Sequence, residues 1–204
     1  VLGVGRSVFL TNIVNWGLNN MDRILIGRLL NAYALGLYNV AYNLATTPNT
    51  LLLGALQPAF LSAGSRLQDE RQRFGNAYAQ MVAVVLVLVT PGFIFLALIA
   101  PDLVHFLYGQ KWIGAAWVLQ VLFLVMPAYV IWGLSTPVLW NTERRNHECA
   151  LQLPILTGGA LAYYFFAGNG IHTVAVIAAL LLVARSIVIG FAALRALQLS
   201  WKKL

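Results

Sequence analysis

A long apolar run between Val82 and Ala100 limits what this chain can fold into. The run reads VAVVLVLVTPGFIFLALIA and contains no ionisable residue. Because a bilayer core about 30 Å thick needs roughly 20 mostly apolar residues per helix, such a run is typical of a transmembrane helix. The whole chain agrees, since its 204 residues are 60% hydrophobic and only 9% charged, whereas about a quarter of a soluble domain is charged.

Five further stretches are long and apolar enough, or nearly so, to cross a membrane. We therefore predict an all-α integral membrane protein with a bundle of six transmembrane helices. The predicted helices cover about residues 7–30, 35–63, 78–100, 115–140, 150–166 and 171–197. Because the chain starts at Val1 without an initiator Met and opens directly into an apolar helix, we expect a fragment of a longer membrane protein.

Two connections between these helices carry structural information. The segment PDLVHFLYGQKW, from Pro101 to Trp112, predicts a short interfacial helix that starts at proline and ends at Gly109. The segment NTERRNHE, from Asn141 to Glu148, predicts a charged loop. Aromatic residues near the predicted helix ends are interpreted as anchors in the membrane interface, and these are Trp112, Trp140, Tyr163, Tyr164 and Trp201.

The Lys and Arg residues predict the orientation of the bundle. Nine of the 13 fall on one side, and these are Arg6, Arg66, Arg71, Arg73, Arg144, Arg145, Arg195, Lys202 and Lys203. Arg28 and Lys111 fall on the other side, while Arg23 and Arg185 lie within spans. Because short cytoplasmic loops carry an excess of Lys and Arg, both termini are predicted to be cytoplasmic, as an even number of helices also requires. Topology, rather than a nucleic-acid partner, therefore explains the net charge of +7.

Polar side chains follow one face of each of the first two predicted helices. On a helical wheel each set falls within an arc of about 100°. The first set is Asn12, Asn15, Asn19, Asp22 and Arg23, and the second is Tyr38, Tyr42, Thr46, Asn49 and Gln57. These groups either line an aqueous cavity or hydrogen-bond across a helix interface as ordinary membrane packing. Asp22 and Arg23 favour a cavity, because an ionised group near mid-membrane costs roughly 2.5–3.5 kcal/mol and marks a pathway.

Arg185 is the other residue whose burial in a membrane costs free energy, because it lies near the middle of the last predicted helix. It needs a carboxylate, backbone carbonyls, water or an anionic ligand as a partner. One interpretation is a structural pair with Asp22, which we place as the only acidic residue within a span. In the other, Asp22 and Arg23 neutralise each other and Arg185 faces the cavity. The predicted cavity-lining, substrate-binding residues are Asn12, Asn15, Asn19, Asp22, Arg23, Tyr38, Tyr42, Thr46, Asn49 and Arg185.

No pattern in the sequence predicts catalysis. A glycine-rich phosphate loop, an HExxH motif and a nucleophile with a base and an orienting group are all missing. The three histidines are too scattered for a metal site, and the single Cys149 has no metal-ligand spacing around it. We therefore predict a protein that is not an enzyme, with no catalytic residue, metal or cofactor.

Three segments resemble a known family of exporters. They are NNMDRILIGRLLNAYALGLYNVAYNLATTP from Asn19, PAFLSAGSRLQDERQRF from Pro58 and APDLVHFLYGQKWIGAA from Ala100. In this order they are similar to the Wzx-type flippases of the multidrug/oligosaccharidyl-lipid/polysaccharide superfamily. The resemblance covers about residues 1–145, and Arg23 falls on a motif position.

The resemblance implies that this chain is the C-terminal lobe of a two-lobed transporter. It implies flipping of an undecaprenyl-diphosphate-linked oligosaccharide across the bacterial cytoplasmic (inner) membrane by alternating access. The product would serve the biosynthesis of surface polysaccharide or lipopolysaccharide. The implied partners are that lipid-linked oligosaccharide, the lipid bilayer and the missing other lobe of the same chain, with no nucleic acid among them.

Three other functions remain open. A multidrug cation antiporter of the same superfamily would need acidic or apolar cavity walls, whereas the predicted spans hold two Arg and one Asp. A membrane-embedded glycan polymerase or ligase component would carry a large extracytoplasmic loop with catalytic residues, and no connection here is long enough. A non-catalytic membrane scaffold would have no reason to bury Arg185 and Asp22.

Overall fold

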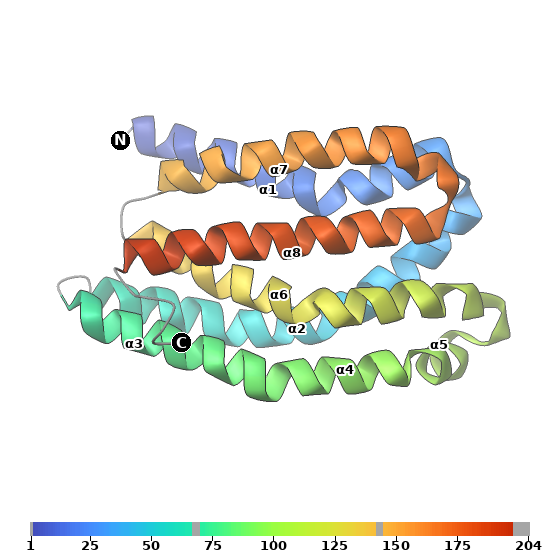
Figure 1. Cartoon of the computed structure of the whole chain (residues 1–204), viewed down its shortest axis with the longest axis horizontal. Helices are drawn as coiled ribbons and strands as arrows, with labels where there is room; N and C mark the ends of the chain where they lie inside the picture. The colour runs from blue at the N-terminus through green and yellow to red at the C-terminus, as the bar shows by residue number, and fades with distance from the viewer. Residues whose placement is uncertain (1, 67–69, 142–144, 198–204) are drawn as a thin grey trace.

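The structure is a computed structural model that describes residues 2–66, 70–141 and 145–197, and helices make up nearly all of these ranges (Figure 1). Side chains are described from residue 9 onward, except at 11, 71 and 145–147. The all-α prediction is confirmed for this part of the chain. The elements are α1 (Leu2–Leu29), α2 (Ala32–Arg66), α3 (Arg71–Val84), η1 (Val85–Val89), α4 (Thr90–Leu98), α5 (Ala100–Tyr108), η2 (Gln110–Ala115), α6 (Ala116–Asn141), α7 (Arg145–Phe166), η3 (Ala167–Asn169) and α8 (Ile171–Ala196).

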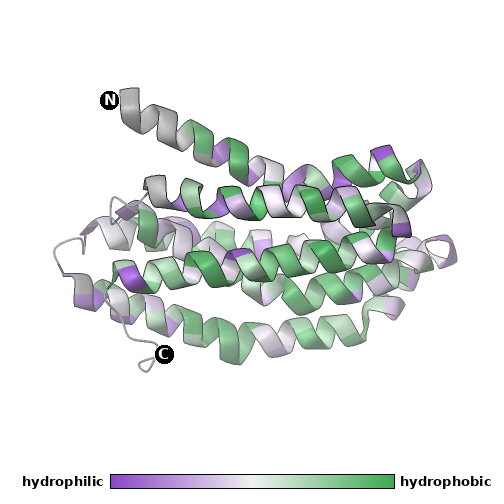
Figure 2. Cartoon of the chain, turned by 45° about the horizontal axis from the view of Figure 1, so that its top comes forward, coloured by the Kyte–Doolittle hydropathy of each residue, from purple (hydrophilic) through white to green (hydrophobic). Residues whose placement is uncertain are grey.

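Four helical stretches of the described residues are long and apolar enough to cross a membrane. They cover Gln72–Leu98, Gln110–Asn141, Glu148–Asn169 and Ile171–Ala196, so the chain is a multi-pass membrane protein. Figure 2 shows hydrophobic residues along the length of α4 and α8, and strongly hydrophilic residues mainly towards the helix ends. The helices α1 and α2 are long enough to span but more polar, so the six-span topology with cytoplasmic termini stays a prediction.

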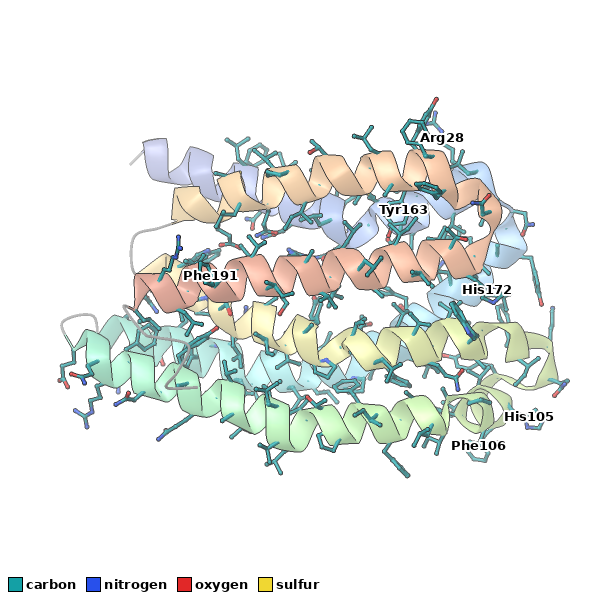
Figure 3. All side chains as sticks on the ribbon, in the orientation of Figure 1. Arg28, His105, Phe106, Tyr163, His172 and Phe191 are labelled. Atoms are coloured by element: carbon teal, nitrogen blue, oxygen red, sulfur yellow. The ribbon has the colours of Figure 1, made fainter. Side chains whose placement is uncertain are left out.

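The long helices run back and forth in one bundle, and α1 begins at the same end at which α8 finishes (Figure 1). Arg66 ends α2, Arg73 lies in the first turn of α3 and Arg195 lies in the last turn of α8, so all three belong to that end. Arg28, His105 and His172 lie at the opposite end (Figure 3). The predicted basic residues Arg6, Arg71, Arg144, Arg145, Lys202 and Lys203 fall outside the described side chains.

The helix α6 is the centre of the bundle. It packs most extensively against α8 and α2, and also against α4 and α7. Most of its side chains are buried, including Leu119, Leu134 and Val138, none of which retains any exposed surface. Close packing depends on glycine at Gly133, where an added Cβ would lie 2.7 Å from a methyl group of Leu53 on α2. Small residues at such contacts let membrane helices approach closely.

The predicted third span is a continuous helical rod with a wide turn in the middle. The helices α3 and α4 are joined by the π-helical turn η1, just before Pro91. A proline lacks the N–H that would bond four residues back, and its ring clashes with that carbonyl, so a local π turn accommodates it. Thr90 also donates a hydrogen bond from Oγ1 to the carbonyl oxygen of Val85 (3.0 Å).

Two predictions about connections have opposite outcomes. The short helix at Pro101 is confirmed, because α5 ends at Tyr108 and is followed by Gly109, whose φ of 81° favours glycine; its interfacial position stays a prediction. The charged loop from Asn141 to Glu148 is wrong for its described residues, since α6 extends to Asn141 and α7 already begins at Arg145, while residues 142–144 lie outside the described residues. Glu148 lies in the first turn of α7 and is completely buried. A carboxylate there is favoured by the positive end of the helix dipole and by hydrogen-bond donors described below.

Candidate substrate-binding site

Arg185 joins α8 to three other helices. Its side chain is only 5% exposed. Its Nε donates to Gln152 Oε1 (2.8 Å) on α7, and its Nη1 and Nη2 donate to Asn19 Oδ1 (2.8 Å) and Asn15 Oδ1 (2.6 Å) on α1. The guanidinium carbon also lies 3.7 Å from the centre of the Trp132 ring on α6. Three of the five N–H donors of arginine are therefore taken by neutral amide oxygens.

A buried glutamate provides the negative charge near Arg185. Glu148 accepts hydrogen bonds from Trp140 Nε1 (2.7 Å), Gln152 Nε2 (2.9 Å) and Thr136 Oγ1 (3.4 Å). Because Gln152 also accepts from Arg185, its amide bridges the two charges. We call Arg185, Gln152 and Glu148, with Asn15 and Asn19, the Arg185 network.

The Arg185 network contains two residues that the sequence interpretation missed. Glu148 and Gln152 share one face of α7 at a spacing of four residues, and that spacing is the signal that would have revealed them. With Glu148 inside the bundle, the two buried or half-buried arginines are matched by two carboxyl groups within the described helices. Charge balance therefore no longer argues against a cation antiporter, and the predicted Asp22–Arg185 pair is not formed.

Asp22 joins α1 to α2 instead. The side chain is 5% exposed. Its Oδ1 accepts from the backbone N–H of Arg23 (2.8 Å), and its Oδ2 accepts from the hydroxyl of Tyr38 (2.5 Å). Such a short contact is typical of a charge-assisted hydrogen bond between a hydroxyl and a carboxylate. Tyr38 itself has no exposed surface, so this bond lies in the interior of the bundle.

The guanidinium of Arg23 bonds to neutral oxygens. Its Nη2 donates to the carbonyl oxygen of Asn19 (2.9 Å) and to Asn20 Oδ1 (3.1 Å), and its carbon lies 4.4 Å from the centre of the Tyr42 ring. Its Nε is buried and has no hydrogen-bond partner. Within the described helices its guanidinium forms no ion pair, so the predicted neutralisation by Asp22 does not take the form of a direct salt bridge.

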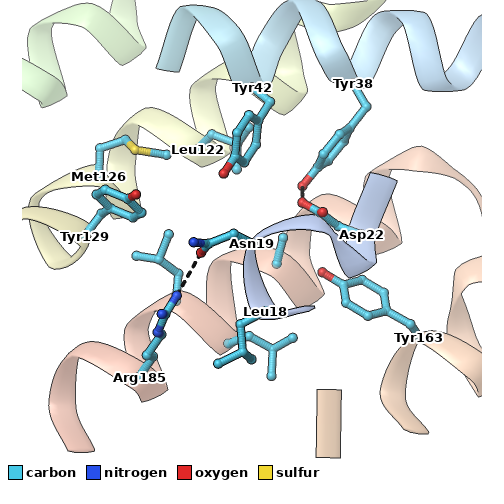
Figure 4. A pocket seen from close by; sticks show the side chains of 13 residues that line it. Leu18, Asn19, Asp22, Tyr38, Tyr42, Leu122, Met126, Tyr129, Tyr163 and Arg185 are labelled. Atoms are coloured by element: carbon cyan, nitrogen blue, oxygen red, sulfur yellow. Dashed lines mark hydrogen bonds between the residues drawn. The ribbon is translucent and has the colours of Figure 1, made fainter. Parts of the chain in front are cut away.

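A small cavity lies between these groups (Figure 4). Its polar lining comes from five of the described helices and consists of Asn19, Asp22, Tyr38, Tyr42, Tyr129, Tyr163 and Arg185. Its volume is about 40 Å³. A buried water needs roughly 10–15 Å³ of such volume, so the cavity accommodates about three water molecules but not a sugar ring.

Tyr163 belongs to this cavity and not to the membrane interface. Its side chain is 1% exposed, while the neighbouring Tyr164 is 74% exposed. Figure 4 shows the Tyr163 hydroxyl pointing towards Asp22. The prediction of an interfacial anchor is therefore wrong for Tyr163. The pair lies beside the end of an apolar helix, where aromatic residues usually meet the membrane interface, and this position hid the inward orientation of the first ring.

The remaining predicted site residues lie away from the cavity. Asn12 is exposed on α1, and Thr46 donates to the carbonyl oxygen of Tyr42 in its own helix (2.8 Å). Asn49 Nδ2 donates to the Met126 carbonyl oxygen on α6 (3.3 Å), and Gln57 makes a similar bond to this helix. Asn49 and Gln57 thus make the interhelical hydrogen bonds of the packing interpretation.

The other side of α2 carries an exposed polar stripe that the sequence interpretation did not single out. Asn43, Thr47 and Thr50 are all exposed at a spacing of four and three residues, which places them on one face of the helix. Ser62 and Ser65 continue the exposed polar surface towards the end of α2. We call these five residues the α2 stripe. It contrasts with α4, where the exposed side chains are large and apolar, such as Phe95 and Leu98.

Comparison with known proteins agrees with a membrane role in polysaccharide synthesis. The family described as polysaccharide biosynthesis protein matches residues 1–117. The chain is 29% identical over 128 residues to the lipopolysaccharide biosynthesis protein WzxC of Escherichia coli (strain K12), covering 61% of this chain and 25% of that protein. It is 32% identical over 131 residues to the teichuronic acid biosynthesis protein TuaB of Bacillus subtilis (strain 168), covering 62% and 26%.

A third relative is described only as a membrane protein in a cps region. The chain is 27% identical over 118 residues to an uncharacterized membrane protein in the cps region of Klebsiella pneumoniae, covering 57% of this chain and 24% of that protein. The chain thus spans about a quarter of the length of these relatives. No solved structure matches the chain.

Proposed function

Because the chain belongs to the polysaccharide biosynthesis protein family, we propose that it is one lobe of a transporter for a lipid-linked oligosaccharide. The cargo would be an undecaprenyl-diphosphate-linked oligosaccharide, moved across the cytoplasmic membrane for surface polysaccharide synthesis. The chain would supply one six-helix lobe, and a second lobe would complete the transporter. Movement would occur by alternating access, in which the two lobes rock around the cargo headgroup.

The observation that carries this proposal is the environment of the Arg23 side chain, namely its burial and its hydrogen-bond partners. A diphosphate crossing about 30 Å of hydrocarbon needs cations or water around it, and arginine matches phosphate with a planar fork of donors. Arg23 lies half-buried on the polar face of α1, bonded only to neutral oxygens, with a buried Nε that has no partner. Its positive charge is therefore available to an anionic headgroup.

The size of the cavity decides where the headgroup would pass. At about 40 Å³ the cavity holds only water, so the sugar would travel along the outer faces of α1 and α2. The exposed amides of Asn12 and Asn43 can donate to and accept from sugar hydroxyls. The Ser and Thr hydroxyls of the α2 stripe donate to carbonyl oxygens of their own helix, so they offer the sugar acceptor oxygens. Asn15, Asn19 and Arg185 lie behind this surface and hold α1 in place through the Arg185 network. The second lobe would close the pathway from the opposite side.

The test is export of polysaccharide by the natural full-length protein in a strain that lacks its own flippase. We expect Arg23→Ala to reduce surface polysaccharide by about 10- to 100-fold, because a charge-assisted hydrogen bond contributes roughly 1.5–3 kcal/mol. Arg28→Ala, on the exposed end of the same helix, is the matched control and should export normally. Normal export by Arg23→Ala at equal expression would refute the assigned role of this residue.

A further inference from the structure

Asp22 is a buried carboxyl group without a cationic partner. Neither of its oxygens lies within salt-bridge distance of a Lys or Arg side chain described in the structure. It is held by one backbone N–H and by the Tyr38 hydroxyl, both neutral donors. A buried carboxylate in this situation loses its hydration and gains hydrogen-bond donors but no direct ion pair. Glu148 differs, because the Gln152 amide connects it to Arg185.

A second hydroxyl faces the same carboxyl group from another helix. Tyr163 on α7 is 1% exposed, its ring reaches the cavity, and its hydroxyl points towards Asp22 (Figure 4). Unlike Tyr38, it makes no hydrogen bond to any side chain or backbone group described in the structure. Two hydroxyls thus flank Asp22, and only the one on α2 is engaged. The Tyr163 hydroxyl can accept a hydrogen bond from a protonated carboxyl group as well as donate one.

The cavity supplies what proton uptake requires. Its volume of about 40 Å³ has room for a few water molecules beside the carboxyl group. The titratable groups that line the cavity come from every neighbouring helix, and they are Asp22, Tyr38, Tyr42, Tyr129, Tyr163 and Arg185. Arg23 lies outside this lining and stacks on the Tyr42 ring. A metal cation would need several oxygen ligands, whereas a proton needs one oxygen.

We propose that Asp22 is a proton-binding site whose protonation exchanges one interhelical hydrogen bond for another. In the ionised state Oδ2 accepts from Tyr38 and ties α1 to α2. A proton delivered by cavity water binds a carboxyl oxygen, and the new O–H donates to the Tyr163 hydroxyl and ties α1 to α7. The proton adds to the carboxylate and no other bond forms or breaks. This proposal holds for any cargo, and only its use as a driving ion rests on the proposed function.

The experiment is an infrared titration of the natural full-length protein in lipid nanodiscs. A protonated carboxyl group absorbs at a different infrared frequency from a carboxylate. Difference spectra between pH values therefore report the fraction of the group that is protonated. We expect a buried carboxyl band that is lost in Asp22→Asn and retained in Glu148→Gln and in Asp102→Asn, which alters an exposed carboxyl on α5. Absence of a titrating buried band, or its loss in Glu148→Gln with retention in Asp22→Asn, would overturn the proposal.

A second pair of variants tests the exchange and does not alter the carboxyl group. Tyr163→Phe removes the acceptor of the protonated state, so we expect the midpoint of the titration to fall by about half to one pH unit. Tyr164→Phe alters the exposed neighbour and should leave the midpoint unchanged. An unchanged midpoint in Tyr163→Phe would overturn the exchange. Because this measurement does not involve export, loss of the proposed transport function would leave its result standing.

Discussion

Removing the charge of Glu148 should destabilise the bundle far more than removing the charge of an exposed glutamate. Glu148 has no exposed surface and Arg185 is 5% exposed, so solvent does not screen the charges. Glu148→Gln keeps the shape but leaves one acceptor oxygen for the two strong donors, Trp140 and Gln152. Removing one partner of a buried ion pair costs 3–5 kcal/mol. Because Gln152 bridges the charges and glutamine retains one acceptor, we expect about 3 kcal/mol.

The assay is unfolding of the full-length protein in mixed micelles by increasing SDS. Tryptophan fluorescence reports the change directly, because Trp132 stacks on Arg185 and Trp140 donates to Glu148. The matched control is Glu70→Gln, which breaks the surface ion pair between Glu70 and Arg73 (3.2 Å). Exposed pairs of this kind contribute no more than about 1 kcal/mol, so the control should unfold almost as the wild type does.

A double variant separates the charge effect from loss of packing. Replacing both charges of a buried pair by neutral groups of similar volume is often nearly neutral. We therefore expect Glu148→Gln combined with Arg185→Met to be more stable than the sum of the two single effects, by about 2 kcal/mol. Strictly additive effects, or a Glu148→Gln variant as stable as Glu70→Gln, would refute the coupling between the two residues.

Two further variants test the packing around the cavity. Gly159→Val should destabilise the protein by about 1–3 kcal/mol, because an added Cβ would lie 2.7 Å from a methyl group of α8. The control Gly158→Val, at an open position, should change stability by less than about 0.5 kcal/mol. Equal effects of the two variants in SDS unfolding would contradict this packing. Tyr38→Phe should cost about 1.5–3 kcal/mol, because it removes the donor to the Asp22 carboxylate. Tyr33→Phe alters an exposed tyrosine whose hydroxyl makes only a long 3.4 Å bond, and a Tyr38→Phe variant as stable as this control would show that the Asp22 bond contributes little.

Helical periodicity predicted the positions of the long helices and the inner polar face of α1. The spacing of Asn15, Asn19 and Asp22 follows from the helix repeat alone, and all three point towards the Arg185 network or the cavity. The same reasoning placed Asn49 correctly on one face of α2. It did not predict that this face contacts α6, because a wheel shows which residues share a side and not which neighbour covers that side.

The rest of the site required the tertiary structure. Glu148 follows Arg144, Arg145 and His147 in the sequence, and such a run of polar residues is typical of a loop. Its burial becomes favourable because Trp140 and Thr136, one helix earlier, and Gln152 on α7 donate hydrogen bonds to it. The burial of Tyr163 could not be predicted from the sequence either, because it depends on α1 and α2 lying opposite it.

The central position of α6 has a consequence for how the protein is made. A chain inserted into the membrane in order would present α6 to lipid before α7 and α8 arrive to cover it. Within lipid every polar group must be satisfied internally, and the serine and threonine hydroxyls of α6 already meet this condition. Ser135 donates to the carbonyl oxygen of Ile131 (2.7 Å) and Thr136 to that of Trp132 (3.3 Å). Before α7 inserts, Ser135 and Thr136 therefore present no unpaired donor to lipid, and Glu148 joins them only when the following helix inserts.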